Sequence, residues 1–475
     1  MTIDIAVILI YIVLINIIGL WFSGGSSVSD YFLGNRSVHW FLACLSIVAT
    51  ETSSLSFISI PGLAYASGTG FLQVTFGYLA GRMLVAAFLL PRYFQGEYET
   101  VYEFLQRRFG RTSRRVVSVI FHITRLFADS VRLFATAIPL TVMTGWDYRL
   151  SLAVIGGATF IYTFYGGIRS VIVTDALQLA LYLFCVGLGA YCVMDELSLS
   201  LGGVFALIPS ADLAFVSSGL GGGAAKLFGS YNLLTGIVGG AFLSFASHGT
   251  DHLIVQRVLS CRDASSARKA MIASGFLVIM QIALFLLFGL FIKALFGGRH
   301  FDSSDSIVPY FIVNHLPAGL RGLMLAGIFA AAMSTLSSSI NSLASSTALD
   351  LLRLKERRLS ERCKVAAARA IAFFWTLAII GVSVLFHDSK NPLVEVGLSI
   401  SSVTYGGVLG IFVLGRFTDG MDPRAALFGV FAGVLAVVSA MAFSSIFWLW
   451  YVALGFGVCV AAALAASKAV SWGLR

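Results

Sequence analysis

A row of hydroxyl and amide side chains runs through the apolar stretch from Ala326 to Asp350. Steps of three and four residues place these side chains on one face of a helix: Ser334, Ser337, Ser338, Asn341 and Ser345. Hydrocarbon offers such groups no hydrogen-bond partner, so this face must meet protein or water. It either packs small residues against neighbouring helices or supplies oxygen ligands to a cation.

A carboxylate in another apolar segment favours the cation interpretation. Asp175 lies in VIVTDALQLALY, which otherwise carries no charge. A hard cation such as Na⁺ prefers oxygen ligands, and several hydroxyls with one carboxylate supply them at a modest desolvation cost. The residue types therefore indicate a sodium site between the two segments.

The composition indicates a membrane protein. Of 475 residues, 58% are hydrophobic and 12% charged, and the mean hydropathy is +0.90, whereas about a quarter of a soluble domain is charged. About 13 apolar stretches are long enough to cross a bilayer as helices, and these lengths exclude a β-barrel. We expect an all-α membrane protein with about 13 transmembrane helices, the first of them retained because MTIDIAVILI lacks a basic leader.

Lysine and arginine in the loops predict the orientation. With the N-terminus outside and the C-terminus cytoplasmic, the basic stretches 107–115, 257–269 and 353–369 all lie inside. The net charge of +9 then reflects topology and contact with the lipid bilayer, and no nucleic-acid partner is expected. The predicted location is the plasma membrane, which in a bacterium is the inner membrane.

Two apolar segments are interrupted by polar residues and glycines. In WFLACLSIVATETSSLSFISIPGLAYASG, the hydroxyls of residues 50–56 and Pro61 predict a discontinuous helix with free carbonyls near residues 49–52. A simple proline kink is the alternative. A second interruption follows in YNLLTGIVGGAFLSFASHGTDHLIVQR. Paired interruptions are typical of inverted-repeat transporters, with the binding site between them.

Six stretches, in order, resemble the sodium:solute symporter family over nearly the whole chain: DYFLGNR, YEFLQRRFG, YGGIRSVIVTDALQ, HGTDHLIVQR, AAAMSTLSSSINS and TYGGVLGIF. The resemblance implies a LeuT-type fold in a single transporter domain, residues 1–475. Within it we expect an extra N-terminal helix and loop (1–38), two inverted five-helix repeats (39–195 and 231–416) and extra C-terminal helices (417–475). It also implies Na⁺-driven import by alternating access.

The resemblance assigns two sodium sites. The usual site would use the carbonyls of Ala49, Thr52 and Ala331 with the hydroxyls of Ser334 and Thr335. The second site, as in bacterial sialic acid symporters, would use one carboxylate and three hydroxyls: Asp175, Ser334, Ser337 and Ser338.

The resemblance also implies a solute site. FHITR resembles the FHIGR of the sialic acid symporters and puts Arg125 at the position of their carboxylate-binding arginine, and Ser53 and Ser56 match hydroxyl contacts there. The remaining predicted substrate-binding residues are Glu51, Gln73, Ser244 and Ser247. Glu51 replaces a threonine and Gly77 a substrate-binding glutamine, so sialic acid itself is not favoured. Ser244 and Ser247 stand where the sugar branch carries amides, so a sugar-type site is not supported.

We therefore predict a sodium-driven symporter for a small polar organic solute. Arg125 and Glu51 favour a carboxylate-bearing or zwitterionic solute over a neutral sugar, unless Glu51 instead pairs with Arg125 or Arg132. A sodium-coupled sugar symporter, a transporter-like sensor and a channel are the alternatives, although no filter repeat or charge ring is apparent. An enzyme is not expected, because no nucleophile, acid–base pair or metal-ligand set is apparent.

Overall fold

The computed structural model describes residues 2–219, 228–386 and 393–473, and its described residues form helices with no strand beyond an isolated bridge between Val38 and Cys261. The α-helices are α1 (Thr2–Trp21), α2 (Val28–Leu33), α3 (Trp40–Glu51), α4 (Ser54–Ser67), α5 (Leu72–Leu84), α6 (Leu90–Gln95), α7 (Glu103–Thr144), α8 (Tyr148–Leu197), α9 (Leu201–Leu207), α10 (Ser210–Leu213), α12 (Gly240–Gly249), α13 (His252–Leu259), α14 (Ala264–Phe296), α15 (Ile307–His315), α16 (Leu320–Ser346), α17 (Glu361–Ser383), α18 (Leu393–Phe417), α19 (Pro423–Phe443) and α20 (Tyr451–Gly473). The expected all-α fold is confirmed.

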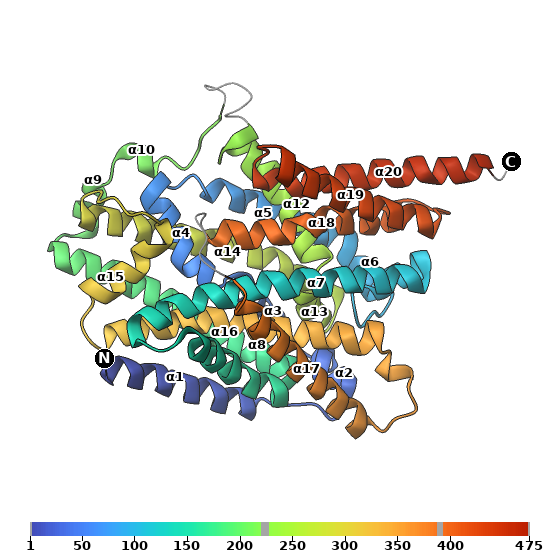
Figure 1. Cartoon of the computed structure of the whole chain (residues 1–475), viewed down its shortest axis with the longest axis horizontal. Helices are drawn as coiled ribbons and strands as arrows, with labels where there is room; N and C mark the ends of the chain where they lie inside the picture. Colours follow the sequence, from blue (N-terminus) through green and yellow to red (C-terminus); the bar gives the residue numbers. More distant parts are fainter. Residues whose placement is uncertain (1, 220–227, 387–392, 474–475) are drawn as a thin grey trace.

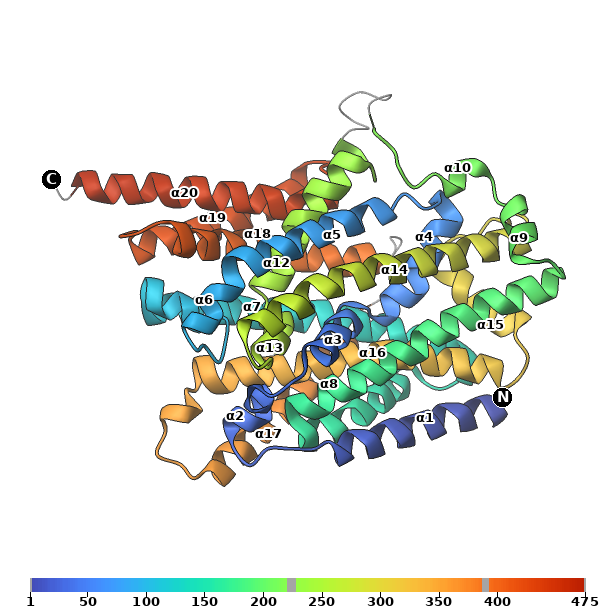
Figure 2. The same cartoon turned by 180° about the vertical axis from the view of Figure 1, so that it is seen from behind.

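Helix α16, which carries the hydroxyl stripe, lies in the centre of the bundle and packs against α8, α1 and α7 (Figure 1). In the most apolar stretch of this helix, 94% of the residues are buried, whereas the corresponding share is 28% in α1, α17 and α19. Figures 1 and 2 both show α1 at one edge and α19 with α20 at the opposite edge. A stripe of hydroxyls is therefore sheltered from lipid by helices on every side.

The first interrupted segment is a broken helix. Helices α3 and α4 meet at an angle of 65°, and Thr52 and Ser53 lie between them. Pro61 lies within α4, so the break does not coincide with the proline and the kink alternative is wrong. The predicted discontinuous helix is confirmed.

The second interruption separates α12 from α13 at Thr250 and Asp251. The Asp251 side chain caps α13 by accepting a hydrogen bond from Leu253 N at 2.9 Å. One sequence assignment needs correction here. Arg257 does not belong to an inner loop, because it lies within α13 and its side chain is fully buried.

The number of spans differs from the sequence prediction. Within the described ranges, nine helices are long and apolar enough to cross a membrane, or ten with the broken pair α3–α4, so the expected 13 are not confirmed. Helix α8 holds 50 residues and includes both segments expected on either side of Gly166 and Gly167. Gly167, with a φ of 60°, interrupts the helix there, and glycine adopts this backbone conformation without a steric penalty.

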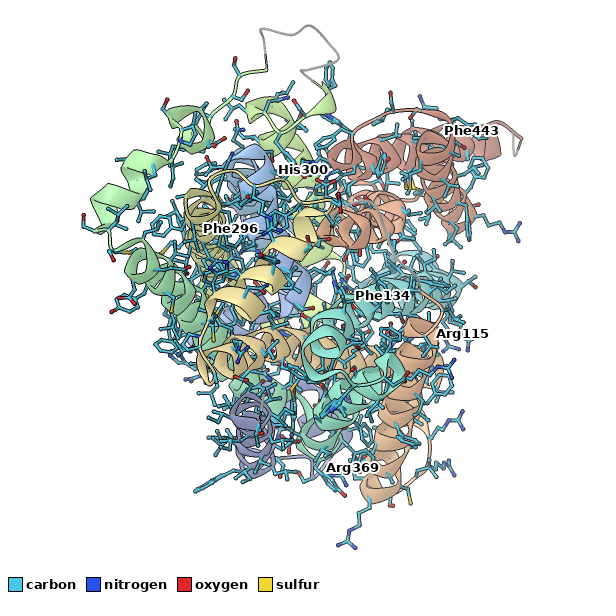
Figure 3. The ribbon with its side chains drawn as sticks, turned by 60° about the vertical axis from the view of Figure 1, so that its left-hand side comes forward. Arg115, Phe134, Phe296, His300, Arg369 and Phe443 are labelled. Atoms are coloured by element: carbon cyan, nitrogen blue, oxygen red, sulfur yellow. The ribbon has the colours of Figure 1, made fainter. Side chains whose placement is uncertain are left out.

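The outer helices present apolar side chains to the surroundings. Phe443, at the end of α19, is 89% exposed and lies at the margin of the bundle in Figure 3. Exposed apolar side chains also line α1 and α17, as expected for surfaces in contact with lipid. The start of α1 and the end of α20 lie at opposite ends of the bundle in Figures 1 and 2.

Candidate functional site

The Thr335 hydroxyl lies among three carbonyl oxygens. Its Oγ1 is 3.2 Å from Ala331 O, 3.3 Å from Thr50 O and 3.4 Å from Thr52 O. The Thr50 carbonyl belongs to the last turn of α3, where helical hydrogen bonding runs out, and the Thr52 carbonyl lies in the break. A hydroxyl group has one proton and can donate to only one of these three carbonyl oxygens at a time. A sodium ion, by contrast, can be coordinated by several oxygens at once.

A further oxygen beside this cluster is uncommitted. Ser334 Oγ is buried and has no hydrogen-bond partner in the described part of the chain, and such orphaned groups call for an explanation. Ala49 is buried in α3, one residue before the Thr50 carbonyl that lies near Thr335. The structure thus brings Thr52, Ala331 and Thr335 together, and this oxygen-rich set fits a sodium ion.

The second predicted site centres on Asp175, which is fully buried in α8. Its Oδ2 accepts a hydrogen bond from Ser46 Oγ at 2.5 Å, and Thr50 Oγ1 and Ser338 Oγ lie 3.4 and 3.5 Å away. Its Oδ1 has no hydrogen-bond partner among the described residues. Ser337 Oγ donates to Ser334 O at 3.0 Å. Of the predicted hydroxyls, Ser338 therefore lies beside this carboxylate, whereas Ser337 donates to the backbone of its own helix.

Sequence reasoning missed Arg257 at this second site. Its Nη2 lies 3.4 Å from Asp175 Oδ2 and donates a hydrogen bond to Ser338 Oγ, while its Nε donates to Ser46 Oγ at 3.0 Å. The motif HGTDHLIVQR contains this arginine, but its place among basic residues suggested a loop. Because the guanidinium engages Asp175 and Ser338, the predicted second sodium set is only partly open to a cation.

The remaining residues of the hydroxyl stripe hold α13. Gln256 Nε2 donates to Asn341 Oδ1 at 2.8 Å, and His252 Nε2 lies 3.1 Å from Ser345 Oγ. Helix packing and cation binding, the two interpretations of the stripe, thus apply to different parts of α16. The half near Ser334 offers oxygens to an ion, and the half beyond Ser338 packs against the second broken helix.

A cavity lies beside the first break. It is lined by four of the predicted substrate residues, Glu51, Arg125, Ser244 and Ser247, and by Thr50, Tyr78, Arg132, Leu243, His248, Leu253, Ile254, Leu398, Ser401 and Tyr405. A smaller cavity of about 250 Å³ is lined by Ser53 and Thr335 and also by Arg132. The solute side and the sodium side of the break therefore lie next to each other.

Two predicted substrate residues line neither cavity. Gln73 Oε1 accepts a hydrogen bond from Ser217 N at 3.1 Å and thereby holds the segment that follows α10, and Ser56 is buried within α4. Gly77 also has a packing role, because a Cβ there would lie 2.3 Å from Gly236 O. This close approach leaves no room at position 77 for the glutamine that the sialic acid symporters carry there.

The charged residues around the larger cavity have charged partners within the protein. Glu51 Oε2 accepts a hydrogen bond from Arg82 Nη2, and His248 Nε2 lies 3.6 Å from the same oxygen. The structure therefore does not pair Glu51 with Arg125 or Arg132, and the alternative that did so is wrong. Arg82, fully buried in α5, is the partner that the sequence did not indicate.

Arg125 and Arg132 each pair with an aspartate, and Asp129 lies near both, since its Oδ1 is 3.7 Å from Arg125 Nη1. Arg125 Nε donates to Asp251 Oδ2 at 3.0 Å, and Tyr405 OH donates to the same oxygen at 2.7 Å. Arg132 Nη1 donates to Asp129 Oδ1 at 2.7 Å. The pairing leaves the cavity lined by balanced charges.

The family model described as the sodium:solute symporter family matches residues 31–433. The chain belongs to this family. A sodium/sialic acid symporter of Aliivibrio fischeri is 25% identical over 460 residues, covering 94% of this chain and 89% of that protein. The sodium-dependent multivitamin transporter of Oryctolagus cuniculus is 29% identical over 428 residues, and the human sodium/iodide cotransporter is 27% identical over 437. The match covers 87% of this chain and 65% of the multivitamin transporter, and 88% of this chain and 66% of the iodide cotransporter.

Solved structures support the fold. The structure of a Na⁺-coupled sialic acid symporter, in a substrate-bound outward-open state, matches this symporter with a TM-score of 0.87 and 24% identity, covering 98% of each chain. Mhp1, a nucleobase-cation-symport-1 family transporter, matches with a TM-score of 0.56 and 15% identity over 94% of this chain and 95% of its own. The LeuT-type fold expected from the sequence is thereby confirmed.

Proposed function

We propose that this protein is a sodium-driven secondary active symporter that imports a small polar organic solute bearing a carboxylate or a zwitterionic pair. The observation that carries the proposal is the Thr335 hydroxyl, which lies 3.2–3.4 Å from three carbonyl oxygens at the break between α3 and α4. Membership in the sodium:solute symporter family supports the choice of sodium. The two broken helices support inverted repeats over 39–195 and 231–416, and a second cation near Asp175 remains part of the proposal.

The geometry of the break suggests how ion and solute are coupled. The carbonyls of Thr50 and Thr52 lie near Thr335, while the intervening Glu51 lines the larger cavity. One short stretch thus offers backbone oxygens to the ion and a side chain to the solute. An ion that bridges α16 and this stretch would fix the position of Glu51, so that each ligand favours binding of the other.

The names of the relatives do not identify a single class of solute. Their names include multivitamins, iodide, sialic acid, glucose and myo-inositol. The residues around the cavity favour a charged organic molecule, because Glu51 and two arginines line it. In this proposal the N-terminus is outside, the C-terminus is cytoplasmic and the protein lies in a plasma membrane such as the bacterial inner membrane.

Thermal unfolding in detergent tests the proposal. Organic acids, amino acids and sugars are screened in sodium chloride and in choline chloride at equal ionic strength. We expect at least one solute to raise the melting temperature in sodium alone, because a ligand that binds only the folded protein stabilises it by mass action. Labelled-solute counterflow in proteoliposomes then separates a carrier from a channel. Equal stabilisation and uptake in choline would overturn the proposal.

A further inference from the structure

Two charged side chains face the larger cavity with part of their surface uncovered. The Glu51 side chain is 23% exposed and that of Arg132 is 15% exposed, against 4% for Arg125. We propose that Arg132 is the arginine that binds the carboxylate of the solute, and that Arg132 and Glu51 together select a zwitterion with an amino group. This inference rests on the proposed function of the same cavity.

Arg125 is held by groups of the protein itself. Its Nε and Nη2 both donate to Asp251 Oδ2, and its Nη2 also lies 2.5 Å from Tyr405 OH. The other oxygen of Asp251 caps α13 by accepting a hydrogen bond from Leu253 N. Its Nη1 lies 3.7 Å from Asp129 Oδ1 and has no hydrogen-bond partner among the described residues, but this atom is buried. A solute carboxylate bound through two hydrogen bonds at Arg125 would have to displace Asp251 or Tyr405 from Nη2, which breaks a buried polar contact.

The guanidinium of Arg132 has N–H donors that make no hydrogen bond among the described residues. Within the described part of the chain, its one hydrogen-bond partner is Asp129, which accepts from Nη1 at 2.7 Å. A guanidinium carries five N–H donors in a planar fork, and such a fork can bind a carboxylate through two parallel hydrogen bonds. Arg132 also lines the smaller cavity that Thr335 lines, so a carboxylate bound here would lie on the sodium side of the solute.

The charge balance around the cavity favours a solute without net charge. Asp251 neutralises Arg125, Asp129 neutralises Arg132, and Arg82 neutralises Glu51. A zwitterion adds no net charge, and it can offer a carboxylate to Arg132 and an ammonium group to Glu51. A simple acid would bring an uncompensated negative charge into a cavity that Glu51 already lines, which is costly where water is excluded.

The test uses the full-length protein in detergent with sodium chloride, and its probes are the standard amino acids. Each amino acid is compared with its decarboxylated amine and its N-acetyl derivative. We expect stabilisation of the wild type by at least one amino acid and by neither of its derivatives. Arg132→Gln should weaken the apparent affinity about tenfold or more, because a charge-assisted pair is lost, and Arg132→Lys should recover part of the loss.

Arg125→Gln serves as the matched variant. We expect it to lower the melting temperature without any solute, because it leaves Asp251 buried and without a counter-charge. Arg132→Gln should lower the melting temperature less, because Asp129 still lies 3.7 Å from Arg125 Nη1, and it should keep the stabilisation by sodium alone. Wild-type affinity of Arg132→Gln for the amino acid overturns the inference, as does its loss of sodium stabilisation. Equal binding of N-acetyl derivatives, or no stabilisation of the wild type by any amino acid, overturns the zwitterion assignment. Amino acid binding that is independent of sodium but lost in Arg132→Gln refutes the proposed coupling and leaves the role of Arg132 standing.

Discussion

Arg257 on α13 donates a hydrogen bond to Ser338 on α16, and the same guanidinium lies 3.4 Å from Asp175 on α8. All three side chains are fully buried. One arginine therefore joins three helices at the place where the sequence resemblance puts a second sodium ion. The contact also ties the second broken helix to the central one.

The buried pair of Arg257 and Asp175 should behave as a unit in stability measurements. We expect Arg257→Gln to destabilise the protein by about 3–5 kcal/mol, because a buried carboxylate loses its counter-charge. The double variant Arg257→Gln with Asp175→Asn should lose less than the sum of the single losses. Unfolding in detergent without sodium measures all three free energies.

A surface pair provides the control for that cycle. Arg108 pairs with Asp419, whose side chain is fully exposed, so Arg108→Gln should cost little. Strict additivity of the two buried substitutions would show that Arg257 and Asp175 do not depend on each other.

Ser334 should matter for sodium and not for the fold. Its hydroxyl is buried and makes no hydrogen bond of normal geometry among the described residues, although it lies near Asp175, so Ser334→Ala removes at most a weak contact within the protein. We expect an unchanged melting temperature without sodium and an apparent sodium affinity lowered roughly tenfold, which corresponds to about 1.4 kcal/mol. Sodium titrations followed by thermal unfolding measure both quantities.

The matched control is Ser346→Ala on the same helix. Ser346 Oγ donates to Asp350 Oδ2 at 2.7 Å, so its loss should lower the melting temperature and leave the sodium affinity unchanged. A reversed pattern, with Ser334→Ala unfolding early and binding sodium normally, would remove Ser334 from the ion site.

Gly77 should not tolerate a side chain. Its Cβ would lie 2.3 Å from Gly236 O and 2.6 Å from Ile237 O, which are backbone atoms of the facing π-helical turn Thr235–Gly239. Gly77→Ala should therefore push α5 away from this turn and destabilise the protein by about 1–3 kcal/mol. At Gly157 a Cβ meets nothing within 4 Å, so Gly157→Ala should be neutral or slightly stabilising. Thermal unfolding of both variants checks the contrast, and similar melting temperatures would contradict it.

Asp251 should stabilise the protein through its charge as well as through its cap. Asparagine can still cap α13, but it cannot neutralise Arg125, so Asp251→Asn should lower the melting temperature. Asp263 caps α14 at the surface by accepting a hydrogen bond from Ser266 N at 2.8 Å, and Asp263→Asn should change the melting temperature little. Equal effects of the two substitutions would mean that the pair with Arg125 adds no stability.

The sequence alone was sufficient for features that neighbouring residues control. The break at Thr52 and Ser53 and the turn at Gly167 follow from local chemistry, because hydroxyls compete for backbone partners and glycine adopts a positive φ. The spacing of Ser334, Ser338 and Ser345 was likewise enough to place one polar face on α16. Each of these features depends on residues within a few turns of one another.

Only the tertiary structure decided which charges meet. Glu51 pairs with Arg82, which lies in an apolar segment, α5, that the sequence did not connect with the site. Arg257 pairs with Asp175, which lies 82 positions away in the chain. The partner of a buried charge depends on which helices pack together and at what depth, and these properties are not periodic along the sequence. For the same physical reason, spacing could not show that Gln73 accepts a hydrogen bond from Ser217, or that the Arg132 side chain is more exposed than that of Arg125.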